Sequence, residues 1–318
     1  MINFIRLVRP KNLFLIIITM YGFGWFLEDF SICLSCGIKS LDFNLIVFST
    51  ILIAAAGNII NDYFDVKADR INKPERLIID KYIKRRVAIF THWILNLIAF
   101  IIAIYLSWHL NTFFYLFIHL LSINCLWYYS VYLKRRVLIG NIVFALLTAL
   151  VPLLVGFYFY TEETNHTIYN YESIQPFELN TKINFILFIS LILSLFAFTL
   201  NLGYEISKDI HDISVYKKLK YNTLAIYLGY KKTRLILMAI LSITIVFSLV
   251  LFFFTIKNIN IITLLPIIIS GFFVLISLYK ILMSKYKSDF KKISLYIELA
   301  IISGLINPTY WKLLLIYG

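Results

Sequence analysis

Long apolar segments alternate with short polar ones along nearly the whole chain. A helix needs about 20 mostly apolar residues to cross a bilayer, and the pattern predicts nine such helices. They are expected near residues 13–33, 43–60, 87–108, 112–132, 137–160, 183–203, 233–256, 259–283 and 293–316. No polar stretch exceeds about 30 residues, which is too short to bury a core of its own. The pattern therefore predicts an all-α, polytopic membrane protein with a single domain over residues 1–318.

The composition supports this interpretation. Of the 318 residues, 61% are hydrophobic and the mean hydropathy is +0.84, whereas a soluble domain is nearer half apolar. Three cysteines are too few for a disulfide framework. Cys33 and Cys36 form a CxxC pair, which we interpret as two small apolar residues at the end of a helix.

Lys and Arg residues are concentrated on one side of the predicted spans. If the N-terminus faces the cytoplasm, all of them fall in cytoplasmic segments except Lys39, Lys182, Lys257 and Lys312. Basic residues favour the cytoplasmic side, so we expect a multi-pass protein of the cell inner membrane with its N-terminus inside. A surface facing the anionic lipid of the bilayer accounts for the net charge of +13, and no nucleic acid partner is required.

A first cluster of polar side chains closes the second predicted span. Asn61, Asp65 and Asp69 are four residues apart, and Asp62 lies three residues before Asp65. If the helix continues, the three side chains share one face, because a step of four residues turns by only about 40°. Hard oxygen ligands at this spacing suit Mg2+, which usually binds one or two carboxylates together with phosphate oxygens.

A second cluster follows the sixth predicted span. Glu205 and Asp209 are four residues apart, as are Tyr204 and Lys208, and again Lys208 and Asp212. A helix through this segment would carry an acidic arc with a lysine within it.

The two clusters point to one chemistry. They close spans of the same parity, so they emerge on the same membrane face, and polar residues at membrane depth are usually functional. A diphosphate at a lipid boundary needs metal ions and basic side chains to neutralise its charge as it leaves. Its apolar part would lie among helices that hold 28 Phe and 22 Tyr residues, whose faces can stabilise a cation.

The motifs also resemble those of a known family. Residues 61–74 resemble the first aspartate-rich motif of the UbiA superfamily of membrane prenyltransferases, and residues 204–212 resemble the second. Arg9-Pro10-x-Asn12 is similar to the N-terminal signature of the family. Three further segments fit in the family's order, namely 129–134, 140–141 and 222–225, so the resemblance covers nearly the whole chain.

This resemblance implies a fold, an activity and a set of site residues. The fold is nine helices around a central cavity open to lipid, and the reaction is Mg2+-dependent transfer of a prenyl group from a prenyl diphosphate to a lipophilic acceptor. The resemblance implies that metal and diphosphate are held by Asn61, Asp65, Asp69, Asp209 and Asp212. It further implies that Lys208 contacts diphosphate, that Tyr204 lines the site, and that Asp62, Arg70 and Arg9 assist substrate binding.

The resemblance is greatest to the archaeal-type branch, which prenylates geranylgeranylglyceryl phosphate. An aromatic acceptor, 4-hydroxybenzoate or another quinone precursor, is the alternative. The chain departs from the family at two places. Tyr216 stands where the second motif usually carries a third acid, and residues 75–80 replace a Pro-Ser-Gly-like turn.

Three other classes of function are alternatives to prenyl transfer. A CDP-alcohol phosphotransferase would need an Asp-Gly-x-x-Ala-Arg opening that the sequence lacks. A cation transporter would carry acids deep within its spans, and only Glu298 is so placed. A non-catalytic relative is suggested by Tyr216.

Overall fold

The computed structural model describes residues 2–31, 37–72, 74–169, 176–256, 265–284 and 286–317. Cys33 and Cys36, and Lys73 of the first motif, lie outside these ranges. The described residues form helices and connecting segments and contain no β-strand.

Nine helices within the described ranges are long and apolar enough to cross a membrane, which confirms the predicted all-α polytopic fold. They are α2 (Pro10–Leu27), α3 (Leu41–Asn72), α4 (Arg85–His109), α5 (Phe114–Val131), α6 (Ile139–Tyr169), α7 (Pro176–His211), α10 (Gly229–Ile256), α11 (Leu265–Met283) and α12 (Phe290–Tyr317). The shorter helices are α1 (Ile2–Val8), η1 (Glu28–Phe30), η2 (Pro74–Arg76), η3 (Leu133–Arg135), α8 (Ile213–Lys218), α9 (Leu224–Tyr227) and η5 (Lys287–Asp289).

The two helices that carry the polar motifs run well past the apolar segments that predicted them. The second span was expected to end near residue 60, but α3 continues to Asn72. The sixth was expected over 183–203, but α7 runs from Pro176 to His211. Both extensions carry the polar motifs. The Asn, Asp and Lys residues of these motifs are compatible with helical backbone. They lower the local hydropathy, however, so the predicted spans ended before them.

The helices form two compact units. One unit comprises Met1–Tyr132 and Leu150–Leu193, and the other comprises Leu133–Ala149 and Ser194–Gly318. The single domain expected over residues 1–318 stays a prediction, and each unit is described in turn.

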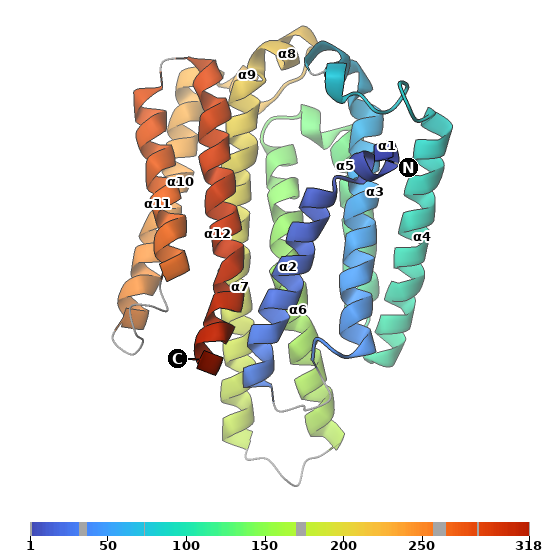
Figure 1. Ribbon diagram of the computed structural model, residues 1–318, viewed down its shortest axis with the longest axis vertical. Helices are drawn as coiled ribbons and strands as arrows, with labels where there is room; N and C mark the ends of the chain where they lie inside the picture. The colour runs from blue at the N-terminus through green and yellow to red at the C-terminus, as the bar shows by residue number, and fades with distance from the viewer. Residues whose placement is uncertain are drawn as a thin grey trace. The chain divides into compact units, whose positions relative to one another are not determined.

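In the first unit, α3 packs along α4 and α5, and α1 lies against α3 (Figure 1). Buried polar side chains join these helices in pairs. His92 donates from Nδ1 to the carbonyl of Ala56 at 2.9 Å, and Ser49 shares a 2.8 Å hydrogen bond with Nε2 of His119. Such bonds satisfy polar groups that have no access to water inside a membrane protein.

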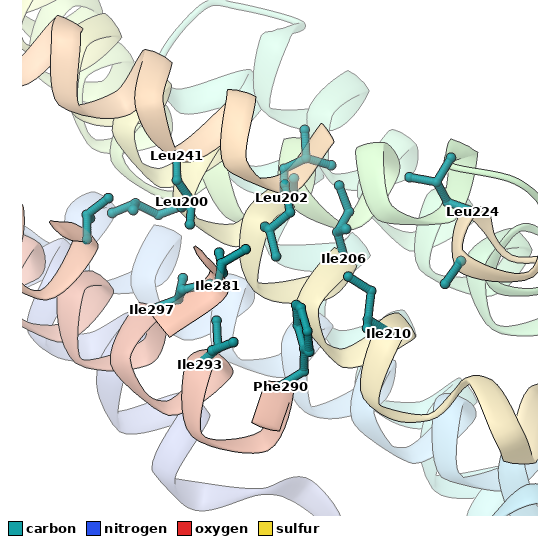
Figure 2. Packing of buried hydrophobic residues seen from close by; sticks show 14 of the residues in the cluster. Leu200, Leu202, Ile206, Ile210, Leu224, Leu241, Ile281, Phe290, Ile293 and Ile297 are labelled. Carbon is teal, nitrogen blue, oxygen red and sulfur yellow. The ribbon is translucent and has the colours of Figure 1, made fainter. Parts of the chain in front are cut away.

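In the second unit, a hydrophobic core is built on one face of α7 (Figure 2). Leu202, Ile206 and Ile210 recur every four residues and are buried against residues of α10, α11 and α12. Because residues four apart share a helix face, this packing fixes the rotation of α7 about its axis. The rotation in turn fixes the direction of the acidic arc one residue earlier, at Glu205 and Asp209.

Candidate active site

The first motif lies on continuous helix, as its spacing required. The whole segment from Asn61 to Asn72 belongs to α3, so Asn61, Asp65 and Asp69 do share a helix face. Asp65 is buried, with 8% of its surface exposed, and the other two are half-buried. The acids of this end therefore sit at the edge of the packed unit rather than in a solvated loop.

Arg9, between α1 and α2, contacts the first motif. Its Nη2 lies 2.5 Å from Oδ1 of Asp62. Arg9 adopts a left-handed backbone conformation (φ 55°) at the break between α1 and α2. Asn58 of α3 holds that break in place by donating to the carbonyl of Val8 at 2.9 Å.

The charge of Arg9 is secured by its surroundings. Burial lowers the pKa of its guanidinium, whereas the charge of Asp62, the hydrogen bond to Asp62 and the charges of Asp65 and Asp69 together raise it. The pKa ends above its usual value, so the side chain stays charged at every pH at which the protein is folded. Arg9 is thus a fixed positive charge beside three carboxylates.

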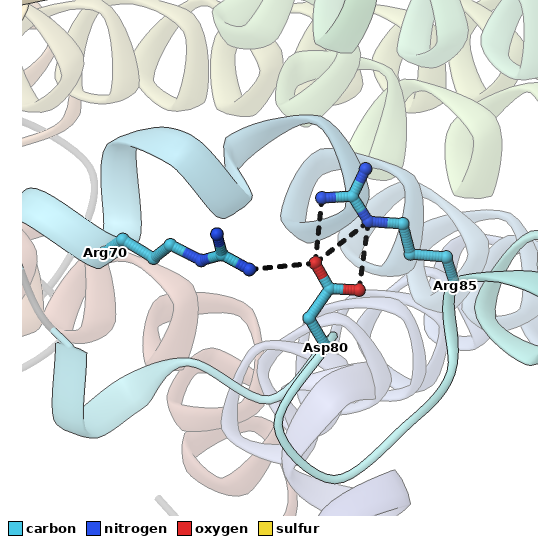
Figure 3. Close-up of polar contacts among 3 residues, drawn as sticks. All are labelled: Arg70, Asp80 and Arg85. Atoms are coloured by element: carbon cyan, nitrogen blue, oxygen red, sulfur yellow. Dashed lines mark hydrogen bonds and ion pairs between the residues drawn. The ribbon is translucent and has the colours of Figure 1, made fainter.

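Arg70 points to a different partner. Its Nη2 lies 3.1 Å from Oδ2 of Asp80, and the same oxygen pairs with Arg85 at 2.8 Å. Figure 3 shows Asp80 between the two arginines. Asp80 has φ 71° and stands in the loop that follows the motif, beside an isolated bridge between Ile79 and Ile83. Ile79 is buried in the small core that also holds Val66 of α3, so this loop is folded onto the motif helix. It is the same segment in which the sequence departs from the family.

The second motif also begins on helix. Tyr204, Glu205, Lys208 and Asp209 belong to α7, and Asp212 follows at the break before α8. The backbone N–H of Asp212 still donates to the carbonyl of Lys208 at 2.9 Å, so the helical spacing of the motif holds to its last acid.

The acids of this end are buried. Glu205, Asp209 and Asp212 are 7–8% exposed. Lys208 donates to Oε1 of Glu205 at 2.8 Å, and its Nζ lies 5.1 Å from the ring centroid of Tyr204. The ring and the carboxylate together fix the lysine beside Asp209.

Asn141 is a site residue to which the sequence assigned no role. Its side-chain amide donates to Oδ2 of Asp209 at 3.0 Å, and both residues are buried. The only sequence signal was the Gly140-Asn141 pair within the resemblance.

Tyr216 stacks on a neighbouring aromatic ring. Its ring lies 5.6 Å from that of Tyr221, and the guanidinium of Arg135 lies 5.2 Å from the centroid of Tyr221. The backbone N–H of Asn222 also donates to the carbonyl of Arg135 at 3.0 Å. Tyr216, which stands where the family usually has its third acid, therefore packs near the contact between η3 and the segment after α8.

The side chains of each end suit a metal that is only partly coordinated by protein. Within the described ranges, no three His, Cys, Asp or Glu side chains gather as a metal-binding group. Mg2+ does not need such a group, because it usually takes one or two carboxylates and completes its coordination with water and phosphate oxygens. Asp65 at one end, and Asp209 and Asp212 at the other, are suitable oxygen ligands for that mode of binding.

A family model described as the UbiA prenyltransferase family matches residues 30–301. The chain belongs to this family. The resemblance inferred from the motifs is thereby confirmed, and this UbiA-family chain is a membrane prenyltransferase with several transmembrane helices.

Curated relatives of this UbiA-family chain share one name. The digeranylgeranylglyceryl phosphate synthase of Methanosphaera stadtmanae is 30% identical over 252 residues, covering 79% of this chain and 81% of that protein. The synthase of the same name from Sulfurisphaera tokodaii is 34% identical over 217 residues, covering 68% and 67%. The one from Methanobrevibacter smithii is 27% identical over 299 residues, covering 93% and 92%.

Solved structures have the same fold. A structure from work on digeranylgeranylglyceryl phosphate synthase in membranes has a TM-score of 0.62 at 21% identity and covers 96% of this chain and 98% of that one. A UbiA homologue from Archaeoglobus fulgidus, bound to GPP and Mg2+, has a TM-score of 0.56 at 17% identity and covers 96% and 99%. These likenesses establish the UbiA fold for this chain.

Proposed function

We propose that this chain transfers a geranylgeranyl group from geranylgeranyl diphosphate to (S)-3-O-geranylgeranylglyceryl phosphate. The observation that carries the proposal is the pair of acid-bearing helix ends, each with a basic side chain fixed beside its carboxylates. A diphosphate with bridging metal is the ligand that such an arrangement suits. The acceptor is proposed because the curated relatives described above are named digeranylgeranylglyceryl phosphate synthases.

We further propose that Mg2+ is the metal, in agreement with the Mg2+-bound Archaeoglobus fulgidus homologue. The ligands would be Asn61, Asp65, Asp69, Asp209 and Asp212. When bound, Mg2+ would neutralise the negative charge that develops on the departing diphosphate. The second and sixth spans run in the same direction by count, which supports ligands from both motifs serving one diphosphate.

Three basic side chains are proposed as the remaining anion contacts. Lys208 and Arg9 are each held beside a carboxylate. Because these side chains are already ordered, they lose little conformational entropy when they bind an anion. Arg70 is the third candidate, and its contact with Asp80 would have to be shared with the substrate. In the transfer, the bond between C1 of the prenyl chain and the diphosphate oxygen breaks. A bond to the acceptor hydroxyl oxygen forms, and the hydroxyl proton is released.

The orientation is proposed from charge alone. The basic segments between spans would face the cytoplasm, so both motifs would open toward the cytoplasmic side of the cell inner membrane. Reporter fusions after residues 82 and 317 test this: a cytoplasmic reporter should be active at the first position and inactive at the second.

The assay that tests the function uses purified protein in lipid vesicles with Mg2+ and labelled geranylgeranyl diphosphate. (S)-3-O-geranylgeranylglyceryl phosphate and 4-hydroxybenzoate are offered separately, and products are identified by mass spectrometry. We expect a digeranylgeranyl product from the first acceptor and none from the second. Product only from 4-hydroxybenzoate would move the chain to the aromatic branch.

Variants connect the reaction to the motifs. Asp65→Ala and Asp209→Ala should abolish product, while Asp29→Asn, an exposed acid in η1, should retain it. Diphosphate binding that needs Mg2+ but yields no product from any acceptor would identify a non-catalytic relative. Cation flux without prenyl transfer would indicate a cation transporter.

A further inference from the structure

The contact between Asn141 and Asp209 joins two helices through a single buried bond. Asn141 lies in the first turn of α6 and Asp209 in the last turn of α7, 68 residues later. The distance from Nδ2 to Oδ2 is 3.0 Å, and the two residues are 7% and 8% exposed. A buried carboxylate without a donor is costly, so this bond is a principal support of the Asp209 side chain.

The local backbone is built to bring Asn141 to this place. A Cβ atom on Gly140 would lie 2.7 Å from the carbonyl oxygen of Leu133 and 2.9 Å from Cα of Lys134. Only glycine permits that approach, so η3 folds directly against the start of α6. The position of Asn141 is therefore set by backbone contacts and not by a flexible loop.

An amide is the appropriate donor for a carboxylate that must also bind a cation. It donates a hydrogen bond to Oδ2 without cancelling the negative charge, whereas a lysine or arginine at residue 141 would compete with the metal for that charge. Among the described residues, the amide bond engages only Oδ2 of Asp209, so Oδ1 can meet a metal while the bond persists. Glu205, one turn earlier on α7, already has Lys208 as its partner.

We infer that Asn141 is a positioning residue: it fixes the rotamer of Asp209 so that the carboxylate meets metal and diphosphate in one orientation. The inference rests on the proposed function, because it takes Asp209 to be a metal ligand. Groups that orient a metal ligand typically change metal affinity by about 10–100-fold when they are removed.

The test is a Mn2+ titration of the protein in detergent, in the presence of inorganic diphosphate, with bound Mn2+ measured by electron paramagnetic resonance. Asn141→Ala should raise the half-saturating Mn2+ concentration by about tenfold or more. Asn201→Ala is the matched control, because Asn201 lies on α7 with Asp209 but donates to the carbonyl of Ala197 in its own helix. That control should bind Mn2+ as the unmodified protein does.

A donor–acceptor exchange separates positioning from simple packing. In the double variant Asn141→Asp/Asp209→Asn, the hydrogen bond can form again but the carboxylate moves from α7 to α6. We expect the melting temperature to recover relative to Asn141→Asp alone, while Mn2+ binding stays weak. A double variant that recovers both stability and Mn2+ binding would overturn the inference.

The Mn2+ titration and the melting temperature together distinguish failure of this inference from failure of the proposed function. If Asn141→Ala lowers the melting temperature yet binds Mn2+ as tightly as the unmodified protein, Asn141 is structural only and the inference fails, whatever the protein transfers. If the unmodified protein binds Mn2+ and Asn141→Ala weakens binding, the inference stands even where no prenyl product forms. If the unmodified protein binds no Mn2+ with diphosphate, both fail.

Discussion

The two acidic ends carry the same residue types but stabilise them differently. On α3, Asp62 faces the partly exposed Arg9, whose side chain is 43% accessible, and Arg70 and Arg85 share Asp80 in the following loop. On α7, Asp209 is buried and faces a neutral amide, while the lysine of the motif is paired with Glu205. Exposed ion pairs contribute little to stability, whereas a buried carboxylate depends on its donor. The ion pairs of the first end thus lie near solvent and should contribute less to stability than the buried hydrogen bond of the second.

The largest expected effects test whether both ends serve one reaction. Asp65→Ala and Asp209→Ala should each reduce the transfer rate by at least about 100-fold, the scale seen when one group that stabilises developing charge is removed. If only one of the two substitutions affects the rate, the ends do not act together. Initial rates at saturating Mg2+ measure this, with Asp29→Asn as the control.

Arg9→Ala should have a smaller effect, a loss of about tenfold in kcat/KM, because a charge-assisted hydrogen bond near solvent is worth roughly 1.5 kcal/mol. Arg9→Lys keeps the charge and should recover part of the loss. An equal loss for both substitutions would mean that the planar geometry of the guanidinium matters more than its charge. Addition of salt should weaken the contribution of Arg9 more than that of the buried Asn141.

Tyr216→Asp would restore the acid that the family usually carries here. A further carboxylate at this end should lower the half-activating Mg2+ concentration several-fold, while loss of the Tyr216–Tyr221 stack should lower the melting temperature. Tyr216→Phe keeps the ring and is the control, expected to change neither quantity. An unchanged Mg2+ dependence in Tyr216→Asp would show that this position does not face the metal.

The smallest effect is expected for Asp80→Ala, which removes the shared partner of Arg70 and Arg85. The loop after α3 should open more often, so trypsin should cleave after Lys81 and Lys84 several-fold faster with little change in the overall melting temperature. Glu75→Gln removes a neighbouring charge outside the ion pairs and should leave the cleavage rate as it is. A rate unchanged in Asp80→Ala would show that the buried Ile79 alone holds the loop.

Much of the fold was predictable because its determinants are local. A run of apolar residues long enough to cross a bilayer has few alternatives to a helix, since every backbone group must be satisfied within the segment. The spacing of Asn61, Asp65 and Asp69 was likewise sufficient to predict a shared face once α3 continued through them. The ends of the helices were less predictable, because polar helical turns beyond the span do not differ in hydropathy from a loop.

The sequence alone determined the family, the membrane-spanning class and the acids of both motifs, since these depend on composition and on spacings within one helix. Only the tertiary structure decided which partners those acids meet. The pairs Arg9–Asp62 and Asn141–Asp209 join residues 53 and 68 positions apart, and Asp80 is turned toward two arginines by a folded loop. Contacts of that kind depend on how helices are rotated and packed against one another, which no local pattern specifies.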